Sequence, residues 1–191
     1  MSVAIAGTQL KKMTHNGNAV KKWVHDGVQV YSAERVLLGE GVNLLGTPTY
    51  GALGTGFYGT YSAASLTPLA DGTYQLALTK DTASWGNLYA SFPNAVAPDG
   101  YSTLRLSCKV KSIGSYGQVW FYTPDAVMTG ATQSDGRTNV YVYNMDAIND
   151  VGVSQSFAFD VTGKDQFYIG FGVQLQPGES ATIIIESLRL E

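Results

Sequence analysis

Residues 104–111 have the sequence Leu-Arg-Leu-Ser-Cys-Lys-Val-Lys, and this stretch decides the fold class of the chain. Apolar and polar side chains alternate strictly along it, which is the period of a β-strand with one buried face. The apolar set, which we expect in a core, is Leu104, Leu106, Cys108 and Val110. We therefore expect Cys108 to behave as a small core side chain rather than as a reactive thiol.

The same alternation recurs on both sides of this stretch, and turn clusters such as Pro98-Asp99-Gly100 separate the segments. No segment has a helical apolar period longer than two turns. We expect strands near 42–46, 57–62, 73–79, 86–92, 102–112, 117–123, 138–144, 153–161, 166–175 and 181–190. Short strands at regular spacing predict an all-β protein whose main body, residues 36–191, is a β-sandwich.

Composition supports this class and excludes several others. The 191 residues include 22 Gly and 12 Tyr, with 45% hydrophobic and 14% charged side chains, so a packed β-rich core is expected rather than disorder or an α/β enzyme. The single cysteine excludes a disulfide-stapled scaffold and a cysteine-rich zinc site.

Residues 1–35 carry five Lys/Arg against two Asp/Glu, and residues 36–191 carry seven against thirteen. An acidic body argues against nucleic acid as a partner.

The first segment follows a ten-residue repeat, in which Leu10–Gly17 is echoed by Val20–Gly27. Asn16-Gly17 and Asp26-Gly27 favour tight hairpin turns. We predict three short antiparallel strands near 8–15, 19–25 and 28–32, which form an N-terminal β-ribbon over residues 1–33. Its apolar side chains fall on both faces, so the ribbon needs a partner: its own body, another protein or sister subunits.

Targeting signals are not evident. The start, Met1-Ser2-Val3-Ala4-Ile5-Ala6-Gly7, lacks the basic region and apolar stretch of a signal peptide. No run reaches the roughly 18 apolar residues of a membrane span. We expect synthesis in the cytoplasm and no membrane partner.

The search for catalytic groups gives no catalytic residue. His15 and His25 occupy equivalent repeat positions without a third metal ligand, and we expect them to be hairpin side chains beside turns. The stretch 51–56 is glycine-rich but lacks the lysine of a phosphate-binding loop, so we expect a flexible loop. The aspartates fall mostly in turns, although a carboxylate pair of a glycan-degrading enzyme remains an alternative. The chain is predicted not to be an enzyme.

Aromatic side chains that the alternation turns away from the core carry the functional hypothesis. Together with one arginine they form a candidate glycan-binding platform, because sugar C–H faces pack on aromatic planes: Trp120, Tyr122, Tyr141, Tyr143, Tyr168 and Arg105. Trp85 and Tyr89 are candidates for its rim. The alternatives are cross-strand aromatic packing and a buried oligomer interface.

Three stretches, Gly41–Leu45, Tyr101–Lys111 and Ala181–Glu191, resemble the carbohydrate-binding-module jelly rolls of the galactose-binding-like superfamily. The resemblance spans about 36–191 and implies a jelly-roll β-sandwich and a polysaccharide ligand. It also implies a structural Ca²⁺ at the position of Glu186, where such modules often carry Asp, and no other cofactor. Because strict alternation places Glu186 on the apolar face, a β-bulge or an internal ion pair is the alternative.

The stretch Val20–Tyr31 resembles N-terminal segments of tail and other virion proteins of phages and prophages. This implies attachment of residues 1–33 to a virion or to sister subunits, a homo-oligomer, and release from the cell by lysis. The combined hypothesis is a non-catalytic virion-associated protein that binds cell-surface glycan. The alternative is a purely structural virion or decoration protein whose sandwich face makes oligomer contacts.

Overall fold

The computed structural model describes residues 13–15, 18–20, 22–25, 28–32, 34–53, 60–115, 117–128, 140–143 and 151–191. The strands of the main body are β5 (Arg35–Gly39), β6 (Val42–Asn43), β7 (Thr49–Leu53), β8 (Tyr61–Pro68), β9 (Tyr74–Lys80), β10 (Gly86–Ser91), β11 (Thr103–Ser112), β12 (Gln118–Tyr122), β13 (Val140–Tyr143), β14 (Gln155–Asp160), β15 (Gly170–Leu175) and β16 (Ser180–Leu190). The described residues contain strands and no helix, and none of them forms a helix suited to crossing a membrane.

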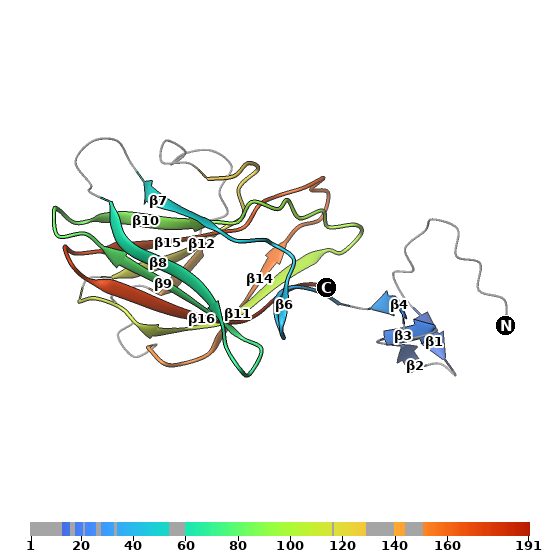
Figure 1. Ribbon diagram of the computed structural model, residues 1–191. Coiled ribbons are helices and arrows are strands. Elements are labelled where there is room, and N and C mark those ends of the chain that lie inside the picture. Colours follow the sequence, from blue (N-terminus) through green and yellow to red (C-terminus); the bar gives the residue numbers. More distant parts are fainter. Residues whose placement is uncertain are drawn as a thin grey trace.

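Two antiparallel sheets face each other in the main body (Figure 1). The five-stranded sheet has the order β13-β12-β15-β10-β7, and the seven-stranded sheet has the order β14-β11-β16-β5-β6, with β9 pairing β16 and β8 pairing β9. The chain changes sheet repeatedly, for example from β10 to β11 and back to β12. The predicted all-β class with a jelly-roll β-sandwich is confirmed.

The core lies between the sheets and follows the predicted alternation. Along β11 the inner side chains Leu104, Leu106, Cys108 and Val110 are all buried. Phe171, Val173 and Leu175 of β15 face them from the five-stranded sheet. Each fully buried side chain of this kind contributes about 1.5–3 kcal/mol to folding. Burial also raises the pKa of the Cys108 thiol to about 12, as expected for a core cysteine.

Three strands near the start of the body differ from the prediction. Strand β5 was not predicted, and β8 begins at Tyr61 rather than near 57. The predicted loop at 51–56 is wrong for its first residues, because Gly51–Leu53 belong to β7 and pair with β10. Gly51 lies in a strand rather than in a loop. Because it has no side chain, it leaves room for the ring of Tyr89 on the neighbouring strand.

The described residues of the N-terminal segment form four short strands: β1 (Met13–His15), β2 (Asn18–Val20), β3 (Lys22–His25) and β4 (Val28–Ser32). His15 pairs with Asn18 and His25 with Val28, so both predicted hairpins are confirmed. The predicted continuous strand 19–25 is instead divided, and β1-β2 and β3-β4 form separate two-stranded sheets. The first part of the predicted strand 8–15 lies outside the described residues.

Candidate functional site

The outer face of the five-stranded sheet carries a row of aromatic residues and glycines. Trp120 of β12 pairs with Gly172 of β15, Gly172 pairs with Tyr89 of β10, and Tyr89 pairs with Gly51 of β7. On the other side of Trp120 the register places Tyr141 of β13. Residues that pair directly across an antiparallel sheet share a face, so Trp120, Gly172, Tyr89 and Gly51 form one row across β12, β15, β10 and β7.

The glycines of this row make room for tyrosine rings. A Cβ atom added at Gly172 would lie 2.7 Å from Cε2 of Tyr122, and one at Gly51 would lie 2.5 Å from the phenol oxygen of Tyr89. Both rings therefore rest on the backbone of a neighbouring strand. Burial raises the pKa of the Tyr89 phenol, and the nearby phenol of Tyr61 raises it further.

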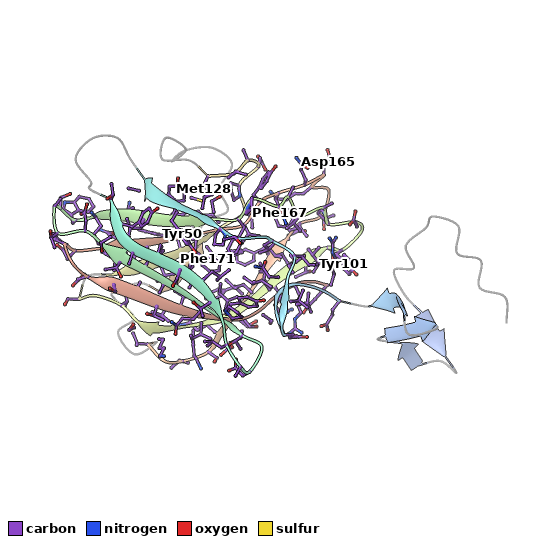
Figure 2. All side chains as sticks on the ribbon, in the orientation of Figure 1. Tyr50, Tyr101, Met128, Asp165, Phe167 and Phe171 are labelled. Atoms are coloured by element: carbon purple, nitrogen blue, oxygen red, sulfur yellow. The ribbon has the colours of Figure 1, made fainter. Side chains whose placement is uncertain are left out.

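One end of the outer face is covered by the segment that follows β12. The backbone N–H of Met128 donates to the hydroxyl of buried Ser91 at 2.9 Å, and its thioether sulfur covers Gly170. Figure 2 shows Met128 on the side of the five-stranded sheet away from Phe171, which lies between the sheets. Met128, Tyr122 and Tyr89 form a small cluster of their own, with Trp120 packed against it.

A row of three carboxamides lies on the same face, on the side of the Trp120 row away from Met128. Gln118 of β12 pairs with Gln174 of β15, and Gln174 pairs with Asn87 of β10. All three side chains are half-buried. Across the described part of the chain, Oδ1 of Asn87 is buried and accepts no hydrogen bond. We refer to Trp120, Gln118, Gln174 and Asn87 as the aromatic–carboxamide face.

The two sheets differ sharply in charge. The five strands β7, β10, β12, β13 and β15 contain no Asp, Glu, Lys, Arg or His. The strands of the seven-stranded sheet contain eight charged residues: Arg35, Lys80, Arg105, Lys109, Lys111, Asp160, Glu186 and Arg189. The sheet with the aromatic row is therefore electrically neutral along every strand.

The structure corrects two members of the predicted platform. Arg105 belongs to the seven-stranded sheet, where its Nε donates to Glu191 at 2.9 Å, so it cannot join the aromatic row. Tyr122 is on the predicted face but is only 4% exposed. The alternative of cross-strand aromatic packing therefore describes Tyr122 and Tyr89 better than a role as open stacking surfaces.

The remaining aromatic residues of the predicted platform differ in exposure and position. Trp120 lies on the outer face and is half-buried, and Trp85 is 47% exposed beside the start of β10. Tyr168 is half-buried, and its backbone N–H donates to Pro124 in the covering segment. The side chains of Tyr141 and Tyr143 lie outside the described residues. A register shift in β12-β13 pairs Tyr143 with the inward residue Val119 rather than with an outward one.

Glu186 occupies a β-bulge, as one alternative predicted. Ser187 pairs with Ser107 and Ile185 with Cys108, so Glu186 has no partner in the register. Its carboxylate accepts a hydrogen bond from the Ser154 hydroxyl at 2.5 Å and lies 3.9 Å from Nζ of Lys109.

The described residues contain no group of three or more His, Cys, Asp or Glu side chains suited to a metal ion. His15 and His25 lie in separate two-stranded sheets.

Sequence reasoning missed the three carboxamides and Met128. The alternation within β12 already places Gln118 on the face of Trp120, and the alternation within β10 places Asn87 with Tyr89. Alternation does not show that β10, β15 and β12 are neighbours in one sheet. This strand order brings the three carboxamides into one row.

Comparison with known proteins finds similarity at the level of structure. No protein-family model and no curated protein sequence matches the chain. A solved structure of promiscuous carbohydrate-binding modules from the β-sandwich superfamily aligns with a TM-score of 0.50 and 15% identity, over 86% of this chain and 66% of that one. The shared feature is the β-sandwich fold. A family 11 carbohydrate-binding module from Clostridium thermocellum, in complex with a β-1,3-1,4-mixed-linked tetrasaccharide, aligns with a TM-score of 0.43 and 9% identity, over 82% and 94%.

Proposed function

We propose that the main body binds a glycan, without catalysis, through the aromatic–carboxamide face. The observation that carries the proposal is the position of the half-buried Trp120 indole beside the row Gln118, Gln174 and Asn87. An indole offers a surface for sugar C–H groups, and carboxamides both donate to and accept from hydroxyls. The β-sandwich fold shared with carbohydrate-binding modules agrees with this assignment.

The buried tyrosines support the site rather than contact the ligand. Tyr122 and Tyr89 rest on glycine backbone and form a cluster with Met128, against which Trp120 packs. A side chain held by such packing loses little conformational freedom when a ligand binds, which favours affinity. Trp85, at the same end of β10 as Asn87, extends the candidate contact area toward the rim.

The test is a glycan array followed by titration calorimetry with the full chain. We expect Trp120→Ala to weaken binding by at least about tenfold, as for a buried aromatic anchor. The control is Arg105→Ala, on the other sheet, which should leave affinity within twofold. Absence of binding to every glycan by the folded protein would overturn the proposal. Release of reducing sugar from a bound glycan would favour the enzyme alternative.

A finer part of the proposal concerns residues 1–33 as an attachment segment of a virion-associated protein. Its support is the repeated hairpin sequence, with Lys pairs at 11–12 and 21–22, joined to an acidic body. The protein would be made in the cytoplasm and leave the cell by lysis as part of a particle or an oligomer. Light scattering of the full chain and of a variant with these four lysines changed to glutamate tests this. An oligomer unchanged by the substitutions would contradict attachment through the ribbon charge.

A further inference from the structure

The five-stranded sheet lacks charge on both of its faces, which is a property that the proposed function does not require. Glycans include chains that carry uronic acids, phosphates or amines, and proteins that bind these present basic or acidic side chains to them. The five strands contain neither kind. A charged group placed on the aromatic–carboxamide face would therefore lose water without gaining an opposite charge.

We propose that the ligand is an uncharged glycan whose hydroxyls are bound by the carboxamide row Gln118, Gln174 and Asn87. This inference rests on the proposed function and names its ligand class. The row crosses three adjacent strands at one level, so its carboxamides are spaced by the sheet itself at about 4.8 Å per strand. Trp120 lies on the same strand as Gln118, two residues further along β12, so its indole adjoins one end of the row.

Asn87 has a side-chain acceptor atom that lacks a hydrogen-bond donor among the described residues. Its Oδ1 is buried and accepts no hydrogen bond from any described residue. A buried acceptor without a partner is destabilising, so such an atom needs an explanation, and a bound group that donates to it is one. Because this atom is out of contact with solvent, binding has to be accompanied by a rotation of the Asn87 side chain that exposes it. A sugar hydroxyl is then a neutral donor of the required kind, whereas a carboxylate or phosphate group would bring a second acceptor.

The net negative charge of the main body also favours an uncharged ligand over an anionic one. Residues 36–191 carry seven Lys/Arg and thirteen Asp/Glu, so the body repels anionic polymers at low ionic strength. The described arginines form ion pairs with acidic side chains: Arg105 with Glu191, Arg189 with Glu34 and Arg35 with Asp99. All three arginines belong to strands of the seven-stranded sheet, which leaves no described guanidinium on the aromatic–carboxamide face.

The first experiment is affinity electrophoresis of the full chain in gels that contain a neutral β-glucan, a neutral galactomannan, polygalacturonate or chitosan. We expect retardation by at least one neutral polymer and none by the two charged ones. For the neutral polymer, the dissociation constant should change less than twofold between low and high salt, because no ion pair is screened. Binding to charged polymers alone, or with equal strength, would overturn the inference and leave the proposed function standing. Binding to none of a full array would overturn both.

The second experiment uses isosteric substitutions. Gln174→Glu replaces the amide donor in the middle of the row by a charge and should weaken neutral-glycan binding at least tenfold. Gln118→Glu is a second variant in case the first does not fold, which thermal melting reveals. The matched control is Gln75→Glu on β9 of the seven-stranded sheet, a half-buried outward position, where affinity should stay within twofold. Equal affinities for the row variants and the control would overturn the role of the row.

Discussion

The phenol ring of Tyr89 on β10 lies over Gly51 on the neighbouring strand β7, so closely that a Cβ atom at Gly51 would come within 2.5 Å of the phenol oxygen. The ring is 8% exposed, and the glycine is what allows this burial. The same relationship joins Tyr122 and Gly172. Two glycines of one sheet thus determine how two aromatic side chains lie on it.

The first prediction follows from this relationship. Gly172→Ala should destabilise the protein by about 1–3 kcal/mol, the usual cost of overpacking, because the new methyl group displaces the ring of Tyr122. Urea unfolding followed by intrinsic fluorescence measures the change. Thr67→Ala, on the exposed strand β8, is the control and should stay within about 0.5 kcal/mol. A Gly172→Ala protein as stable as wild type would show that the ring moves without cost.

Much of the sandwich follows from the sequence because the alternation marks which side chains face inward. Cys108 and Phe171 were placed correctly for this reason. Alternation does not say to which sheet a strand belongs, so the sequence-based prediction places Arg105 with Trp120, although they lie on different sheets. It also does not say whether an outward face is covered, and Tyr122 is buried by a segment that returns over the sheet.

The second prediction concerns Lys80, whose side chain is wholly buried at the end of β9. Its Nζ donates to Asp81 at 2.5 Å and to the carbonyl of Thr60 at 3.2 Å. Lys80→Ala should cost about 1.5–3 kcal/mol, because it removes the hydrogen bonds of a charged group while the Asp81 carboxylate that remains is still partly exposed. Urea unfolding checks this. Lys111→Ala, at the exposed end of β11, should change little, and an equal effect of both variants would contradict the role assigned to Lys80.

The third prediction gives the pH dependence of this pair. Hydrogen bonds from Lys80 and from the backbone N–H of Thr60 lower the pKa of Asp81 from 3.8 to about 2. A lowered folded-state pKa means that the contribution of Asp81 is complete above about pH 4 and is lost as the pH falls toward 2. The melting temperatures of wild type and Asp81→Asn should therefore differ at pH 5 and converge toward pH 2. A difference that stays constant over this range would refute the assignment.

The fourth prediction concerns Cys108, whose thiol pKa burial raises from 9.0 to about 12. Three pKa units lower the thiolate fraction near neutral pH by about a thousandfold. We expect a thiol reagent such as iodoacetamide to label the native protein at pH 8 at least about a hundredfold more slowly than the urea-unfolded protein. Mass spectrometry follows the labelling. Equal rates would mean that the strand β11 opens freely.

The last prediction separates packing from binding on the five-stranded sheet. Tyr122 is buried on glycine backbone, so Tyr122→Ala should cost about 3 kcal/mol of stability, as for other large-to-small aromatic substitutions. Trp120 is half-buried at the edge of the same cluster, so Trp120→Ala should cost less stability while reducing glycan affinity more than Tyr122→Phe does. Calorimetry and urea unfolding of the three variants measure both quantities. If Trp120→Ala lost stability as Tyr122→Ala does but kept full affinity, the indole would be a packing residue, and the aromatic–carboxamide face would lose its anchor.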